Sequence, residues 1–243
     1  MQRSGKSIIL TTYVVIWLSI ATSMSGQPHI PSNDRSRQVT ARVRPILEQD
    51  MESVGLRFGA SIYMRIFKEE HELELWVQND SQFVLYKTYP VCCWSGTLGP
   101  KLQYGDFQAP EGFYYTKPSS LNPYSAFHLS FNTEYPNLYD QLRGRTGSAI
   151  MVHGNCVSIG CFAMTDPVIE DLYTLADGAL RNGQPFFRIH IFPFRMNREN
   201  MEKHNQSEWY SFWENLKEGY DYFEEHNHTP PNVDVKNLRY IFN

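Results

Sequence analysis

The chain has 243 residues, of which 42% are hydrophobic and 20% charged, values that are ordinary for a packed protein. Aromatic residues make up 14%, which favours a strand-rich core because aromatic side chains suit a pleated, half-buried surface. The formal net charge of −4 argues against strong, sequence-independent binding of nucleic acid, which needs clustered Lys and Arg.

Residues 1–25 have the pattern of a secretory signal. Arg3 and Lys6 precede an apolar run at 7–20, and small residues close the segment. The alternative is an uncleaved anchor, because the run is close to the length that spans a bilayer. No cysteine lies near the cleavage site, which excludes a bacterial lipoprotein anchor. We expect a cleaved signal and a protein that works outside the cytoplasm.

Residues 26–58 are predicted to connect this signal to a folded domain. Residues 27–38 are polar, contain two prolines and indicate a linker. Residues 43–54 are a short helical candidate. The domain itself is predicted to begin at residue 59, where the pattern changes to strands.

The first strands are predicted close together in the chain. Residues 61–67 are β-branched and aromatic, and residues 72–77 begin with strict alternation, which predicts a half-exposed strand. Turn residues follow at 79–81, and residues 82–89 resume the strand pattern. The last two segments are therefore predicted to form a hairpin.

The chain has only four cysteines, at positions 92, 93, 156 and 161, too few for a disulfide scaffold. A secreted protein lies in an environment that favours disulfides. Cys92 and Cys93 are adjacent, however, and cannot easily bridge to each other without strain. We interpret both as small buried hydrophobic residues.

Residues 95–112 are rich in Gly and Pro and predict a long shaped loop, a kind of segment that often carries function. Further strand candidates follow it at 113–116, 126–131, 148–153 and 186–192.

Two helices are predicted in the second half. One begins at Asp166, with Pro167 as its first helical residue, and ends at Gly183. The other covers about 206–225, where an aromatic stripe at helical spacing indicates a face that packs onto the sheet. The fold class is therefore mainly β with flanking helices, α+β. The domain is predicted at 59–195 and a C-terminal helical extension at 196–243.

His153 and Cys161 are the candidate catalytic pair. Residues 148–152 predict a buried strand that ends at His153, and the eight residues to Cys161 allow the loop to bring the imidazole to the thiol. A neighbouring His lowers the pKa of a thiol and so activates it for acyl transfer. The N–H groups of Gly160 and Cys161 are candidates for stabilising an oxyanion.

Two alternatives remain open on spacing alone. His153, Cys156 and Cys161 are competent zinc ligands, but the spacing matches no common zinc pattern and a fourth ligand is missing. A Cys156–Cys161 disulfide would abolish the nucleophile.

Several motifs resemble one known family. The sequence GSAIMVHG at 147–154, followed by SIGC at 158–161, resembles the active-site signature of the YkuD-type L,D-transpeptidases. Longer motifs resemble the YafK-like branch of murein L,D-transpeptidases. They are IFKEE at 66–70, YKTYP at 86–90, SGTLGPK at 95–101, GDFQAPEGFY at 105–114, HLSFN at 128–132, GRTG at 144–147, HIFPFR at 190–195 and FW at 212–213. The resemblance covers about residues 60–225.

The sequence departs from the general signature at two points. Ile159 stands where most relatives carry a second histidine, and no Arg or Asn follows Cys161. The interval between His153 and Cys161 is also short for the family, although these features look normal for the YafK-like branch.

The resemblance implies a β-sandwich catalytic domain that acts in the periplasm on peptidoglycan stem peptides. Cys161 would attack the carbonyl of diaminopimelate and form a thioester, His153 would move the proton, and the Gly154 carbonyl would orient the imidazole. An amine acceptor would give transpeptidation, and water would give hydrolysis. For the YafK-like branch the resemblance implies release of an outer-membrane lipoprotein from peptidoglycan. No cofactor or metal is expected.

Candidate substrate contacts are Arg143, Arg145, Ser158 and Lys101. For the two arginines a solvated turn is the competing interpretation, and for Lys101 a role in loop structure. At the level of function, the alternatives are a catalytically silent module that binds peptidoglycan and a structural zinc protein.

Overall fold

The computed structural model describes residues 29–243. The predicted secretory signal therefore lies outside the described residues. Within 29–243, no helix is both long and apolar enough to cross a membrane.

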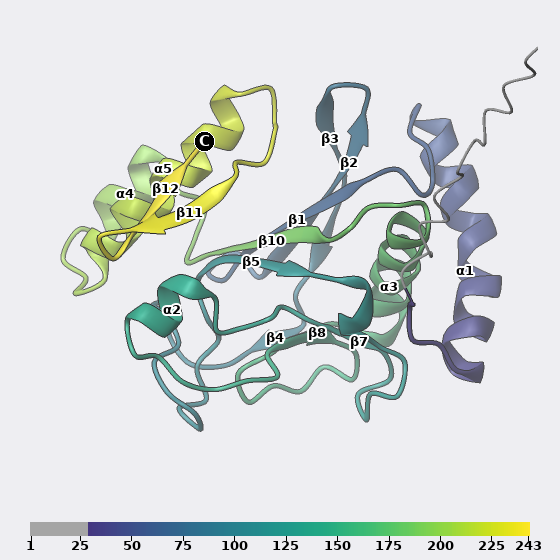
Figure 1. Cartoon of the computed structure of the whole chain (residues 1–243), viewed down its shortest axis with the longest axis horizontal. Helices are drawn as coiled ribbons and strands as arrows, with labels where there is room; N and C mark the ends of the chain where they lie inside the picture. The colour runs from purple at the N-terminus through teal and green to yellow at the C-terminus, as the bar shows by residue number, and fades with distance from the viewer. Residues whose placement is uncertain (1–28) are drawn as a thin grey trace, which may run out of the picture.

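Two five-stranded sheets form the centre of the molecule, one above the other in Figure 1. The first has the order β3-β2-β1-β10-β5, and the second has the order β4-β9-β8-β7-β6. The strands of the first sheet are β1 (Ile62–Phe67), β2 (Glu72–Asn79), β3 (Gln82–Pro90), β5 (Gly112–Thr116) and β10 (Phe187–Phe192). Those of the second are β4 (Cys93–Trp94), β6 (Leu121–Asn122), β7 (Ser130–Asn132), β8 (Met151–His153) and β9 (Phe162–Ala163).

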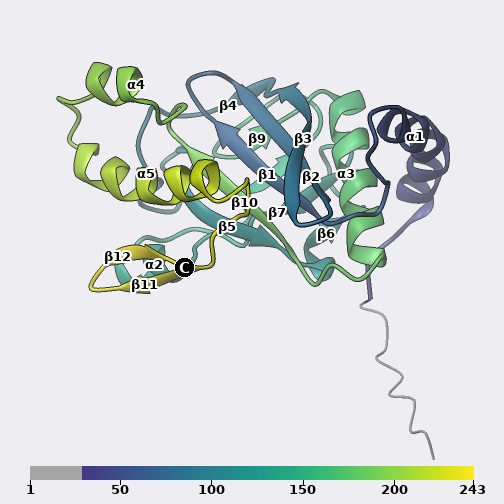
Figure 2. The same ribbon diagram turned by 90° about the horizontal axis from the view of Figure 1, so that it is seen from above.

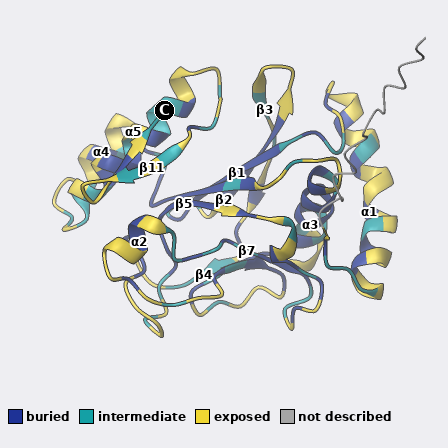
Figure 3. Ribbon diagram, viewed as in Figure 1, coloured by how far each residue is buried: buried dark blue, intermediate teal, exposed yellow. Residues whose placement is uncertain are grey.

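The main hydrophobic core joins both sheets to two helices. Phe131 and Val152 of the second sheet and Ile189 of the first belong to one buried cluster. Helices α1 (Asp34–Ser53) and α3 (Asp166–Arg181) lie side by side at one end of the sheets and add their inward faces to it, as the burial colours of Figure 3 show. Burial of this apolar surface drives the association of the layers. The predicted α+β fold class is confirmed.

The C-terminal segment packs on the other end of the sheets (Figure 2). It contains the predicted helix, α5 (Tyr210–Glu225), and the buried Trp213 and Phe223 confirm that its aromatic stripe is a packing face. It also contains elements that the sequence did not predict. They are α4 (Arg198–Lys203) and a hairpin of β11 (Val233–Lys236) and β12 (Arg239–Phe242). The remaining short elements of the fold are η1 (Pro118–Ser120) and α2 (Leu138–Leu142).

The hairpin of β2 and β3 forms as predicted, but β2 is not half-exposed. Glu74 is only 3% exposed because its carboxylate accepts hydrogen bonds from Arg65, Trp76 and Arg195. The alternating pattern was therefore misleading at Glu74, which is covered by charged and aromatic partners, one of them, Arg195, 121 positions away.

The N-terminal ends of α1 and α3 differ from the prediction. Helix α1 begins nine residues before the predicted start at 43, because Asn33 and Ser36 form a capping box at 33–36. Helix α3 takes Thr165, not Asp166, as its N-cap. The Asp166 carboxylate instead accepts the Asn155 N–H at 2.8 Å, and so ties the helix to the loop after β8.

The Gly/Pro-rich loop is held by a buried lysine. The Nζ atom of Lys68 donates to the carbonyl oxygens of Thr97, Gly99 and Ala109 and lies 3.0 Å from the carboxylate of Glu111. Both side chains of this ion pair are fully buried. Trp213 of α5 donates to the second carboxylate oxygen of Glu111. The loop is thus anchored to the first sheet and to the C-terminal segment.

Candidate active site

Strands β8 and β9 place the two candidate catalytic residues. They are parallel neighbours, and His153 on β8 pairs with Ala163 on β9. Cys161 immediately precedes β9, so it lies two residues back along the strand from the partner of His153. Since side chains alternate between the faces of a sheet, Cys161 and His153 are directed to the same face.

Both side chains line one cavity of about 690 Å³. Segments from the Gly/Pro-rich loop, the approach to β8 and the loop before β9 form its wall. The lining residues are Lys101, Tyr104, Gly105, Phe107, Phe127, Ser148, Ala149, Ile150, Met151, His153, Val157, Ser158, Ile159, Gly160 and Cys161. Among these lining residues, Lys101 is the single member of the types Lys, Arg, Asp and Glu. Two of the lining residues, Tyr104 and Ile159, are 80% and 74% exposed, so the cavity presents apolar side chains to the surface.

The imidazole of His153 is fixed in orientation. Its Nδ1 lies 2.6 Å from the Gly154 carbonyl oxygen, to which it donates, and this leaves Nε2 as an acceptor in the neutral ring. The Phe127 ring packs against it at 4.6 Å between centroids. Burial lowers the pKa of His153, and the Gly154 hydrogen bond offsets part of that effect. The ring is therefore uncharged near neutral pH.

The thiol of Cys161 is also uncharged in this state. Burial raises its pKa, while the Met151 N–H, which donates to Sγ at 3.4 Å, and the charge of Lys101 act in the opposite direction. Sγ is 3.6 Å from the Ala149 carbonyl oxygen. Among the described residues, no hydrogen bond joins Cys161 to His153. Catalytic hydrogen bonds are often long in unliganded enzymes and shorten when substrate binds.

The loop before Cys161 is organised by Ser158. Its hydroxyl accepts the Gly160 N–H at 3.2 Å and donates to the Cys161 carbonyl at 2.8 Å. Gly160 has φ of +136°, a conformation that favours glycine because it has no Cβ. The Gly160 N–H, which we expected to face an oxyanion, is therefore engaged by Ser158 in the unliganded protein.

Lys101 lies in the cavity wall in a fixed position. Its Nζ is 2.5 Å from the Asp106 carboxylate and 3.0 Å from the Gln103 carbonyl oxygen. The Asp106 carboxylate also accepts hydrogen bonds from the backbone N–H groups of Leu102 and Gln103, and so holds the turn at 101–106 together. Lys101 is thus both a loop residue and a wall residue of the cavity.

The structure places Arg143 and Arg145 away from this cavity. Arg145 is buried and pairs with Asp140 at 2.7 Å. Arg143 donates to the Leu238 carbonyl oxygen. Both line a separate hollow beside Trp209 of the C-terminal segment. The structure therefore does not bring our two candidate contacts to the cavity of Cys161, but uses them to join the turn after α2 to the C-terminal segment. The competing interpretation of a solvated turn is wrong for the buried Arg145.

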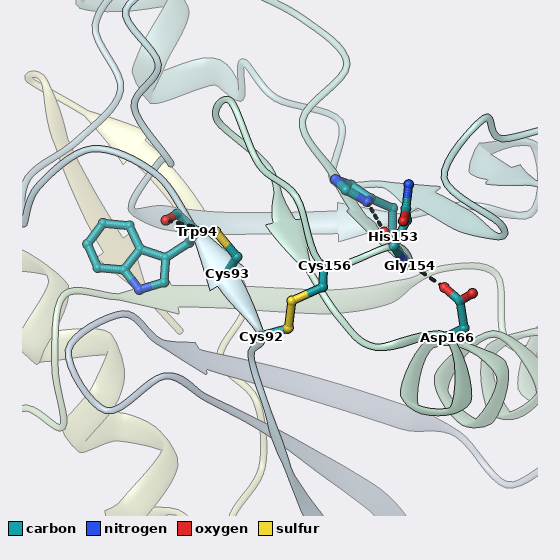
Figure 4. The surroundings of a disulfide bond; sticks show 8 residues. Cys92, Cys93, Trp94, His153, Gly154, Cys156 and Asp166 are labelled. Carbon is teal, nitrogen blue, oxygen red and sulfur yellow. Dashed lines mark hydrogen bonds between the residues drawn. A yellow bond between two sulfur atoms is a disulfide. The ribbon is translucent and has the colours of Figure 1, made fainter.

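A disulfide joins Cys92 to Cys156 (Figure 4). Our interpretation of Cys92 as a small hydrophobic residue and the alternative Cys156–Cys161 disulfide are both wrong. Cys93 and Cys161 are free thiols. The zinc alternative required Cys156 as a ligand, and its sulfur is bonded to Cys92 instead. The two bridged residues are 64 positions apart, so only the tertiary fold brings them together.

Comparisons with known proteins identify the family. The profile of the YkuD family, described as the L,D-transpeptidase catalytic domain, matches residues 61–191. Proteins of two Escherichia coli strains, K12 and O157:H7, both named "Putative L,D-transpeptidase YafK", are each 46% identical over 183 residues. This alignment covers 75% of the chain and 74% of each relative.

Matches to solved structures are weaker. The helical cell shape determining protein Pgp2 (K307A mutant) of Campylobacter jejuni gives a TM-score of 0.45 at 17% identity, over 79% of this chain and 66% of that one. Bd1075 of Bdellovibrio bacteriovorus gives 0.39 at 19% identity, over 73% and 78%. The assignment is carried by the profile and by the 46% identity. The chain belongs to the YkuD family of L,D-transpeptidase catalytic domains.

Proposed function

We propose that the protein is a cysteine acyl transferase that cleaves and transfers peptidoglycan stem peptides. The observation that carries the proposal is the shared cavity, in which the Cys161 thiol and the unprotonated Nε2 of His153 face one space. Such a nucleophile and base, with the base oriented by a third group, are the parts that covalent acyl transfer needs.

The uncharged resting pair favours general-base activation over a preformed thiolate. His153 Nε2 takes the thiol proton as Sγ attacks the carbonyl of the stem peptide. The tetrahedral intermediate then collapses to a thioester, and the imidazolium gives its proton to the leaving amine. The Gly154 carbonyl, which accepts from Nδ1, holds the ring in the tautomer that this step requires.

The oxyanion needs N–H donors directed at it as the intermediate forms. Gly160 and Cys161 remain the candidates, on condition that substrate displaces the Ser158 hydroxyl from the Gly160 N–H. Ser158 also lines the cavity, which supports its role as a substrate contact.

Lys101 is proposed to attract a carboxylate of the stem peptide. It brings the one formal positive charge to a lining that is otherwise mostly apolar. Diaminopimelate-containing peptides carry free carboxylates, which an ammonium group binds by charge-assisted hydrogen bonds; a substrate carboxylate would share the Lys101 ammonium with Asp106.

For the acceptor, we propose an amine or water; with water, the reaction would release a lipoprotein attached to the stem peptide. The resemblance to the YafK-like motifs is the reason to include the release reaction, and the Escherichia coli relatives are named as putative L,D-transpeptidases, a name that fits an amine acceptor. A periplasmic location is proposed as well, because a disulfide between Cys92 and Cys156 is typical of an oxidising compartment.

Intact mass after incubation with a carbapenem, which acylates enzymes of this family, tests the nucleophile. We expect one covalent adduct on the wild-type protein and on C93A, which keeps the second free thiol out of the comparison, and none on C161A. An unmodified wild-type protein, or an adduct on C161A, would contradict the mechanism.

Incubation with purified sacculi tests the reaction. Released lipoprotein or altered muropeptides are expected with the wild-type protein and not with C161A. Binding of stem peptide without any turnover, unchanged in C161A, would favour the alternative of a silent binding module.

A further inference from the structure

The disulfide lies in the same loop as the nucleophile. Cys156 and Cys161 are five positions apart in the segment between β8 and β9, and Cys156 is held by Cys92, which lies just after β3. The loop therefore contains one bridged sulfur and one free thiol.

The backbone at Cys156 is held at several points. Asn155 and Cys156 have φ of +68° and +41°, a conformation that is unfavourable for residues other than glycine. The Asn155 N–H donates to Asp166, the Cys156 N–H donates to the Met164 carbonyl oxygen at 3.1 Å, and the disulfide fixes the side chain.

The rest of the loop is held mainly by the hydrogen bonds of the Ser158 hydroxyl. Residues 157–160 have no helix or strand, and Val157 and Ile159 are 51% and 74% exposed. Segments with few buried apolar contacts rearrange readily. A free thiol at Cys156 could thus form a disulfide with Cys161, because two cysteines five positions apart in one loop meet at high effective concentration.

We propose that Cys92 protects the nucleophile: by bonding Cys156, it prevents a Cys156–Cys161 disulfide that would inactivate the enzyme. The proposal rests on Cys161 as the nucleophile of the proposed function. It gives the disulfide a chemical role beyond holding the loop.

The chemistry balances with a small disulfide such as oxidised glutathione as the oxidant. In a protein without Cys92, the Cys161 and Cys156 thiols together lose two electrons and two protons and form one S–S bond. Oxidised glutathione accepts them and leaves as two molecules of glutathione, through a mixed disulfide on one of the two cysteines.

Three variants of the full chain test the proposal: C92S, C92S/C156S and C93S. Each is reduced, exposed to oxidised glutathione, and then divided between carbapenem acylation and blocking of free thiols with N-ethylmaleimide. Peptide mapping without reductant identifies the disulfides formed.

We expect oxidation to lower acylation of C92S at least tenfold, with a Cys156–Cys161 disulfide in the map. Dithiothreitol should restore the activity, which excludes misfolding as the cause. C92S/C156S, which lacks both the partner and the competitor, should remain acylated after oxidation. C93S should behave as the wild-type protein.

Two results would overturn the proposal. One is that C92S is acylated after oxidation as fully as before it, and that its Cys161 thiol still reacts with N-ethylmaleimide. The other is equal loss in C92S and C92S/C156S that dithiothreitol does not reverse, which would leave the disulfide a purely structural role. Failure of the proposed function is recognised separately, because the disulfide map and maleimide labelling do not depend on acylation. A wild-type protein whose peptide map shows the Cys92–Cys156 disulfide but which is never acylated would refute only the catalytic assignment.

Discussion

At the scale of single residues, the cavity holds two reactive groups that are uncharged at rest. Burial moves the pKa of His153 down and that of Cys161 up, so both shifts favour the neutral forms. A pair of this kind needs the imidazole as a base at the moment of attack. Its activity must therefore depend on the protonation of His153.

The acid limb of the pH–rate profile should follow from the lowered pKa of His153. The base is active above its folded-state pKa, so acylation should persist at about pH 6.5, the ordinary pKa of histidine, and fall only at lower pH. Carbapenem acylation rates measured across this range give the midpoint. H153Q should lose about 10²- to 10⁴-fold in rate and show no limb. A wild-type midpoint above 6.5 would contradict the assignment.

K101M should raise the pKa of the Cys161 thiol, because it removes the positive charge that stabilises the thiolate. An interaction of about 1 kcal/mol corresponds to roughly fivefold slower alkylation by iodoacetamide near neutral pH. The matched control is K117M, whose ammonium pairs with Glu134 outside the cavity lining. Equal reactivity of K101M and the wild-type protein would show that Lys101 serves the loop alone.

At the scale of elements, the Gly/Pro-rich loop forms one wall of the cavity because Lys68 and Glu111 fix its base. Carbonyl oxygens and a carboxylate surround the Lys68 ammonium completely, and no water is needed to satisfy it. Removing one partner of a buried ion pair leaves the other charge uncompensated.

K68M should destabilise the protein by about 3–5 kcal/mol, because Glu111 would stay buried without its cation. The control is K203M, which breaks the more exposed pair with Glu69 and should cost at most about 1 kcal/mol. Urea unfolding of both variants gives the two values. Similar small losses would mean that the buried pair contributes no more than a surface pair.

At the scale of the whole molecule, the C-terminal segment is packed directly onto the catalytic sheets. Gly219 of α5 lies where this contact is closest: a Cβ at this position would come within 2.6 Å of the Phe113 ring and 2.5 Å of the Phe242 ring. Phe113 belongs to β5 and Phe242 to β12, so three elements meet at this glycine.

G219A should lower the free energy of unfolding by about 1 kcal/mol. Overpacking costs about 1–3 kcal/mol, which exceeds the gain of about 1 kcal/mol that alanine brings to a helix. S211A, at an exposed position of the same helix, is the control and should change stability little. Thermal or urea unfolding gives the sign of the stability change, and a stabilised G219A variant would show that the contact at Gly219 is loose.

The sequence by itself determined the fold class, the β2–β3 hairpin, helices α3 and α5 and the motif that contains His153 and Cys161. These features depend on local patterns: alternation, helical spacing, capping and short motifs.

The tertiary structure alone decided the burial of Glu74, the Cys92–Cys156 disulfide and the placement of Arg145 outside the cavity. Each depends on partners that local patterns do not identify. The partners of Glu74 include Arg195, 121 positions away, and Cys92 and Cys156 are 64 apart. Arg145 and Asp140 are near neighbours, but the C-terminal segment that covers them comes from the far end of the chain. Burial and pairing of this kind are properties of the packed chain, and no local spacing encodes them.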